Sequence, residues 1–234
     1  MRDQYAGDIS DVLKFSLLRF LAANDRKLGI AWYYAPSDDG RSDGRHLEWQ
    51  IDEAWHRLDH EVAFALSNLP VRSLEALEHA QIWPAGAIFH RQPIPHSSDR
   101  EKWVTNKHQV LGECDLVFLD PDNGLGTDPE KHATFEEVKR LRKAGRAIVF
   151  ITFPKRIKHD LQVRELHAKL VAEAGAKAAF TIRTSVSVPG AKPGSFVPRA
   201  RWFTVVDGDT ELWTRAHLFA EKLSAIPRAK AEIS

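Results

Sequence analysis

A dense polar turn follows the most apolar stretch of the chain. Residues 116–119 are Leu-Val-Phe-Leu, and 120–124 are Asp-Pro-Asp-Asn-Gly. A strand that is covered on both faces need not alternate, so the apolar run predicts a buried central strand. Proline and Asn-Gly then end it in a turn. Asp120, Asp122 and Asn123 are therefore expected at the carboxyl end of that strand, where open α/β sheets bind ligands. The alternative is an ordinary Asp-rich turn.

A second polar set lies near the start of the chain. Asp11 and Lys14 are three residues apart, so they lie on one side of a helix that Asp8 or Ser10 would cap. The simplest interpretation is an exposed ion pair on a capped helix.

Basic residues cluster after the apolar stretch at 146–153 and again near residue 200. They are Lys155, Arg156, Lys158, Arg199 and Arg201. Such residues could follow a phosphate backbone, which supplies affinity without reading the base sequence. A solvated charged face is the alternative.

Apolar periodicity and turn residues divide the chain into helices and strands that must position these groups. Strands are expected at 28–35, 87–89, 115–119, 146–153, 178–188 and 201–206. Helices are expected at 10–23, 47–66, 71–79, 98–111, 134–143, 159–174 and 210–223, with a loop at 189–198 and a polar tail. Strands that alternate with helices predict a Rossmann-like α/β fold, with helices on both faces of a mostly parallel sheet. The last two strands predict an antiparallel edge.

Length and composition limit the class of protein. A chain of 234 residues that is 43% hydrophobic predicts a single α/β domain over 1–234, with a helical insert around 46–80. The net charge of +1 gives no global attraction to nucleic acid, so any such binding needs a local patch. A lone cysteine, Cys114, excludes a disulfide framework, and the 11 histidines lack metal-ligand spacing. We expect no signal peptide and no membrane span, and hence a cytoplasmic protein. The oligomeric state is left open.

The order of elements resembles the class I S-adenosylmethionine-dependent methyltransferases, whose sheet ends in an antiparallel strand. Within that fold the chain resembles the bacterial family that methylates adenine N6 of large-subunit ribosomal RNA. The family's Ala-Gly-Asn-x-x-Asp-Val-Leu-Lys motif corresponds to 6–14, Ala-Gly-Asp-Ile-Ser-Asp-Val-Leu-Lys, and its Asp-Pro-Pro-Tyr corresponds to 120–123. The strand end at 153–154 and the late strand pair also fall in register. The loop at 38–44, Asp-Asp-Gly-Arg-Ser-Asp-Gly, is also similar to one in a set of prokaryotic proteins of unassigned function.

The resemblance implies roles for several residues. Asp120 would hold the target adenine amine, and Asp122 and Asn123 would shape the pocket. Lys14 and Tyr5 would reach into the cofactor side of the cleft. Two departures fall on functional positions: the turn after the first strand has one glycine at 35–40, and 122–123 lack the family's second proline and its aromatic ring.

The resemblance also makes the first and the central strand neighbours, so their acidic loops would share one cleft. Asp38, Asp39 and Asp43 follow the first strand and would face Asp120 and Asp122. Carboxylates so close repel one another unless a positive group is present. Lysine or arginine side chains could supply it, giving a salt-bridged rim, and so could Mg²⁺ or Mn²⁺, which prefer oxygen ligands. A third interpretation is a cofactor site in which the carboxylates bind hydroxyl groups.

Three functions follow. The first is an S-adenosylmethionine-dependent methyltransferase acting on an adenine amine of RNA or DNA, with Lys155, Arg156, Lys158 and Arg199 as nucleic-acid contacts. The second is a divalent-metal-dependent nuclease or phosphoryl-transfer enzyme. The third is a binding module for nucleotides or nucleic acid that retains the cleft without catalysis. Fold alone does not choose among them.

Overall fold

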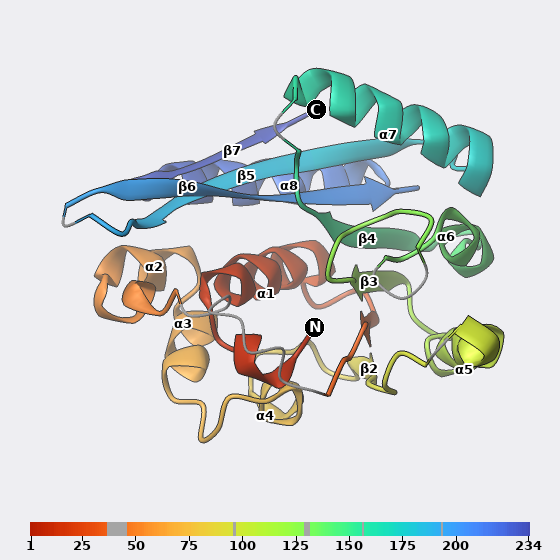
Figure 1. Cartoon of the computed structure of the whole chain (residues 1–234), viewed down its shortest axis with the longest axis horizontal. Helices are drawn as coiled ribbons and strands as arrows, with labels where there is room; N and C mark the ends of the chain where they lie inside the picture. Colours follow the sequence, from red (N-terminus) through yellow and green to blue (C-terminus); the bar gives the residue numbers. More distant parts are fainter. Residues whose placement is uncertain (37–45, 96, 129–131, 156, 193) are drawn as a thin grey trace.

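The computed structural model describes residues 1–36, 46–95, 97–128, 132–155, 157–192 and 194–234. These residues contain one seven-stranded sheet with the order β2-β1-β3-β4-β6-β5-β7 (Figure 1). The strands are β1 (Leu28–Trp32), β2 (Ile88–His90), β3 (Leu116–Asp120), β4 (Ala147–Thr152), β5 (Ala179–Pro189), β6 (Phe196–Val206) and β7 (Ala229–Ile233).

The sheet is parallel at one end and antiparallel at the other. β1 pairs in parallel with β2 and β3, and β3 pairs in parallel with β4. β6 then pairs antiparallel with both β4 and β5, and β7 pairs antiparallel with β5. Every residue of β1 and β3 is buried, as expected for central strands covered on both faces. The predicted fold class, a mostly parallel sheet with an antiparallel edge, is confirmed.

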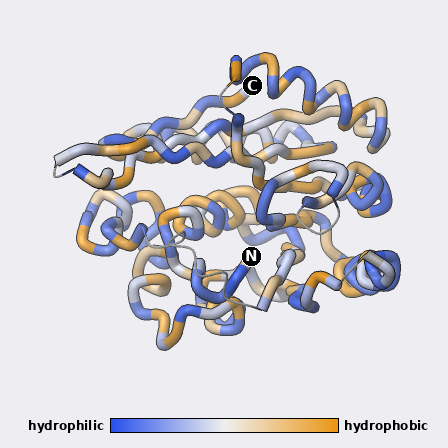
Figure 2. Tube along the Cα trace, in the orientation of Figure 1, coloured by the Kyte–Doolittle hydropathy of each residue, from blue (hydrophilic) through white to orange (hydrophobic). Residues whose placement is uncertain are grey.

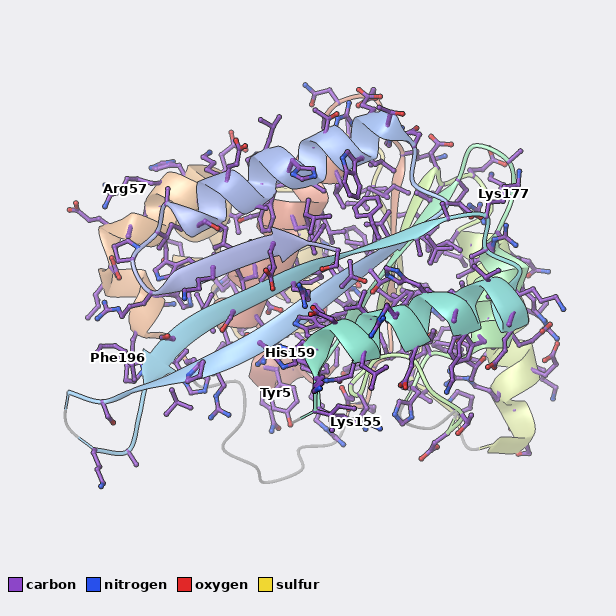
Figure 3. All side chains as sticks on the ribbon, turned by 90° about the horizontal axis from the view of Figure 1, so that it is seen from above. Tyr5, Arg57, Lys155, His159, Lys177 and Phe196 are labelled. Carbon is purple, nitrogen blue, oxygen red and sulfur yellow. The ribbon has the colours of Figure 1, made fainter. Side chains whose placement is uncertain are left out.

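Helices cover both faces of the sheet. The larger core lies under α1 (Ile9–Ala22), α2 (Glu53–Leu58), α3 (His60–Ser67), α4 (Leu74–His79) and α8 (Thr210–Ser224). The smaller core lies under α5 (Arg100–Val110), α6 (Phe135–Leu141) and α7 (His159–Ala174). Figure 3 shows α7 and α8 on opposite sides of the antiparallel strands. We call the two sides the α1 face and the α7 face. None of the helices in the described residues is long and apolar enough to span a membrane.

Figure 2 shows that α5 is largely hydrophilic, although it packs against the sheet. It contributes Trp103 and Val104 to the core and also buries Lys107 completely. A weakly amphipathic helix is therefore held in place by a few apolar side chains and by buried charge, which is described with the site below.

The predicted helix over 47–66 is wrong, because three shorter elements occupy that stretch: η2 (Glu48–Ile51), α2 and α3. Asp52 and Asp59 interrupt it, and each is an N-cap in extended conformation. The Asp52 side chain accepts a hydrogen bond from Ala54 N, and the Asp59 side chain accepts one from Val62 N. Aspartate competes for backbone N–H groups in this way, which favours a new helix start over a helix interior.

The predicted loop at 189–198 and polar tail also differ from the structure. β5 and β6 form one long hairpin whose register continues to Pro189↔Phe196, and it projects past α2 in Figure 1. Pro198 is tolerated because β4 pairs with β6 only from Trp202 onward, so this half of β6 is an edge strand. The tail forms β7, which depends on pairing with β5 and carries little apolar signal of its own.

Candidate functional site

The predicted polar turn lies at the carboxyl edge of the parallel strands. Asp120 ends β3 and is only 4% exposed, whereas Asp122 and Asn123 are exposed. Gly124 has φ +79°, and a Cβ there would lie 2.9 Å from Thr152 Cγ2, so the turn packs closely on the end of β4. The glycine that predicted the end of the strand therefore also lets the turn fold back over the sheet edge.

Helix α1 brings a lysine into contact with Asp120. The Asp8 side chain caps α1 by accepting a hydrogen bond from Ser10 N. Within the helix that starts there, Lys14 Nζ lies 2.9 Å from Asp120 Oδ2 and 2.7 Å from Asp11 Oδ1. All three side chains are at least 95% buried, since their exposed fractions are 4%, 5% and 1%. The alternative of an exposed ion pair is thus wrong: Asp11 and Lys14 point into the protein and join Asp120 in a buried triad.

The triad combines two carboxylates with one ammonium group. Burial raises the pKa of Asp11 to about 6, against the attraction of Lys14. Burial also opposes the charge on Lys14, but Asp11 and then Asp120 outweigh it, so the pKa of Lys14 is raised. Lys14 is consequently a permanent ammonium at neutral pH, and the triad carries an excess of negative charge when both carboxylates are ionised.

The raised pKa of Asp11 predicts a distinctive pH dependence of stability. Its ordinary pKa is 3.8 and its pKa in the folded protein is about 6, so between these values the folded state binds more protons than the unfolded state. The free energy of unfolding should therefore fall as pH rises through that window, by about 3 kcal/mol at most for a shift of two units. Urea titrations of the wild type and Asp11→Asn from pH 4 to 7 should show the wild type losing stability relative to the variant.

An exposed carboxylate provides the control for this prediction. The side chain of Asp160 is 81% exposed, so Asp160→Asn should follow the wild-type pH profile. A wild-type advantage over Asp11→Asn that stays constant or grows with pH would contradict the assigned burial.

The first residues of the chain lie across the same edge. The Met1 amine donates to Asp122 Oδ1 at 2.7 Å and to the Tyr33 carbonyl oxygen at 2.5 Å. Tyr34 Oη donates to Asp3 Oδ2 at 2.8 Å. Tyr5 is half-buried, and Figure 3 shows it at the same end of the sheet as Lys155 and His159. Lys14 and Tyr5 thus lie at the carboxyl edge, although their assignment to a cofactor stays a prediction.

A second buried ionic cluster, which the sequence did not suggest, lies on the α7 face under the end of β1. Lys107 Nζ is 2.7 Å from Glu137 Oε2 and 2.9 Å from Tyr33 Oη, and Arg100 also pairs with Glu137. Burial lowers the pKa of Lys107 to about 8, with Glu137 opposing the shift. The only sequence signal was a lysine one turn after the apolar pair Trp103 and Val104. This cluster joins the end of β1 to α5 and α6.

The structure describes only some of the remaining predicted residues. Asp38, Asp39, Asp43 and Arg156 lie outside the described residues, as do Arg41 and Arg45. Lys155, Lys158 and Arg199 are exposed, and Arg201 is half-buried. The described part of the chain holds no group of three or more His, Cys, Asp or Glu side chains that could bind a metal ion. The Mg²⁺ or Mn²⁺ interpretation therefore gains no support from Asp120 and Asp122.

Comparison with known proteins adds information on the fold. No protein-family model and no curated protein matches the sequence. The protein LPL1258 from Legionella pneumophila, of the family model DUF519, has a similar structure with TM-score 0.51 and 12% identity over 98% of this chain and 97% of its own. A SAM-dependent methyltransferase from Agrobacterium tumefaciens matches with TM-score 0.39 and 11% identity over 84% of this chain and 61% of its own. At such identities the first likeness shows the fold alone, and the second is too distant to support an argument.

Proposed function

We propose that this protein is an S-adenosylmethionine-dependent methyltransferase that modifies an amine of a nucleic-acid base. The observation that carries the proposal is the Asp120 carboxylate, fixed by Lys14 at the carboxyl end of a central parallel strand. Ligands of open α/β sheets bind at this edge. The motif resemblance at 6–14 and 120–123, to the family that methylates adenine N6 of large-subunit ribosomal RNA, supports the same assignment.

The charge of the site suits methyl transfer. S-adenosylmethionine would supply a cationic methyl donor, so a group that binds it must tolerate positive charge on the donor and on the acceptor nitrogen. A fixed excess of negative charge at this place stabilises both the bound cation and the transition state, without reorganisation during the reaction. The triad of Asp11, Lys14 and Asp120 provides that excess, with Asp122 beside it paired to the Met1 amine.

We assign each of these residues a role. Lys14 holds Asp120 Oδ2, and we assign Oδ1 to accept a hydrogen bond from the acceptor amine and so direct its lone pair to the methyl group. The exposed Asp122 and Asn123 are assigned to the rim of the acceptor site. Tyr5 and Lys14, with Asp38, Asp39 and Asp43, are assigned to the cofactor side, and Lys155, Arg156, Lys158 and Arg199 to the nucleic acid.

Calorimetric titration with S-adenosylmethionine tests the cofactor, and transfer of a labelled methyl group to bulk RNA or DNA tests the reaction. We expect saturable binding, and a loss of about 10²–10³-fold in transfer rate for Asp120→Asn, the size typical of removing one preorganised polar group. Asp160→Asn, at an exposed position, should transfer at the wild-type rate. A folded protein that shows no heat of binding with millimolar S-adenosylmethionine would contradict the proposal.

A further inference from the structure

Phe153 is an aromatic side chain that stays open to solvent beside Asp120. It follows Thr152, the last residue of β4, and is 39% exposed. The turn after Asp120 packs on that same Thr152, as the close approach of Gly124 shows. β3 and β4 are paired up to Leu119↔Phe150, so this register sets Ile151 opposite Asp120 and carries Phe153 two residues, about 7 Å, further along the same edge.

Phe153 and Asp120 project from the same side of the sheet. Phe118 and Ile151 both belong to the core under α1, and side chains two residues apart on a strand share a face. Asp120 therefore points to the α1 face, as its contact with Lys14 requires, and the alternation carries Phe153 to that face too. Position 123, where the resembled family has an aromatic ring, is an exposed asparagine in this chain.

The ring is held by a fixed arginine. The guanidinium carbon of Arg201, in β6, lies 5.0 Å from the centre of the Phe153 ring. Arg201 Nε donates in turn to Ser10 Oγ at 2.9 Å, in the first turn of the helix that carries Lys14. A cation over one face of the ring restrains its orientation. The ring position is thus coupled to the same helix that fixes Asp120.

Exposed cations lie near Phe153 along the chain and along β6. Lys155 and Lys158 are exposed in the segment that follows it, and Gln162 of α7 fixes the backbone of Lys155 through both its N–H and its carbonyl group. Arg199 is exposed two residues from Arg201, and the strand period places both on one face, about 7 Å apart. An open ring beside several cations is the combination that binds single-stranded nucleic acid, with bases stacked and phosphates neutralised.

We propose that Phe153 is the platform on which the acceptor base stacks, and that the acceptor is an unpaired base of a single-stranded polynucleotide. This inference rests on the proposed function for the identity of the reaction, but it concerns recognition of the acceptor. A base in a duplex has both faces covered by its neighbours and must leave the stack to use such a platform. Free single strands should therefore bind more tightly than the same sequence in a duplex.

The test is the affinity of the full chain for a fluorescently labelled 12-nucleotide strand, measured by anisotropy with RNA and with DNA. Stacking on one aromatic ring is typically worth 1–3 kcal/mol, so Phe153→Ala should weaken binding about 5- to 150-fold. Phe153→Leu keeps an apolar side chain and should be equally weak, whereas Phe153→Trp should restore the affinity. Phe64 is 59% exposed on α3 and lines a pocket with His60 and Ala80, so Phe64→Ala is the matched control and should bind like the wild type.

Two results would overturn the inference: binding by Phe153→Leu within twofold of the wild type, or wild-type binding that is no tighter for single strands than for the duplex. Calorimetry with S-adenosylmethionine separates this outcome from failure of the proposed function. Cofactor binding with no effect at Phe153 refutes the stacking role alone. A ring-dependent loss of strand affinity without cofactor binding refutes the methyltransferase and upholds the platform. Comparison of the affinities for the RNA and DNA strands shows whether the site prefers ribose or deoxyribose.

Discussion

Replacing Lys14 by methionine should lower the free energy of unfolding by about 3–5 kcal/mol, because it leaves two buried carboxylates without their counter-ion. Lys14 is 4% exposed and contacts Asp11 and Asp120 within 3 Å, so water cannot replace its ammonium group without opening α1. Urea or guanidinium denaturation followed by circular dichroism measures the loss. Lys102→Met is the matched control, because Lys102 pairs with Asp99 at an i, i+3 spacing and is 86% exposed. Its change should stay within about 0.5 kcal/mol.

The cause of this loss can be separated from loss of packing. The triple variant Lys14→Met, Asp11→Asn and Asp120→Asn removes all three charges while it keeps the side-chain sizes similar. Neutral replacement of a whole buried ionic cluster is often nearly neutral in stability, so the triple variant should be clearly more stable than Lys14→Met alone. It should still fail in methyl transfer, because Asp120 has lost its charge. A Lys14→Met variant that loses less than 1 kcal/mol would show that the triad is not a closed ionic unit.

The sequence predicted the end of β3 and the turn after it better than it predicted the partners of Asp120. The apolar run before Asp120 and the glycine after it are local signals, because a buried strand and a turn with positive φ each demand particular residue types. The burial of Asp11 and Lys14 has no such local signal. The same i, i+3 pair would look identical on an exposed helix, and only the approach of β3 to α1 makes it part of a triad.

Errors in the predicted elements have a similar origin. Strand β7 and the outer half of the β5–β6 hairpin contain prolines, glycines and charged residues that disfavour strands, but pairing with β5 overrides these preferences. The separation of 47–66 into shorter helices could have been predicted from the sequence, since Asp52 and Asp59 are good N-caps. Phe153 was predicted only as the end of a strand. Its exposure beside Asp120 depends on where β4 stops relative to β3, which is a property of the register.

We expect Arg146 to tolerate replacement least among the residues at the amino ends of the parallel strands. It is 3% exposed just before β4, and its guanidinium group donates to four carbonyl oxygens at 2.7–2.9 Å. The acceptors are Leu111 and Gly112 after α5, Cys114 before β3 and Leu141 at the end of α6. Carbonyl groups at helix ends have no partner within the helix and carry the negative end of the helix dipole. One arginine therefore neutralises two helix ends and ties both to the start of the central strands.

Arg146→Met should accordingly cost about 3–5 kcal/mol, because several buried carbonyl groups lose their donors at once. Arg146→Lys should cost less but still about 2 kcal/mol, since an ammonium group cannot reach the acceptors in the fixed geometry of a guanidinium fork. Denaturant titration gives both values, and Arg140→Met is the control, because Arg140 is 37% exposed on neighbouring α6 and pairs with surface glutamates. A loss for Arg146→Met no larger than that for Arg140→Met would mean that other groups or water satisfy these carbonyls. Because Arg146 lies at the amino ends of β3 and β4, its conservative variant should leave the affinity for the proposed cofactor, S-adenosylmethionine, at the opposite, carboxyl edge unchanged.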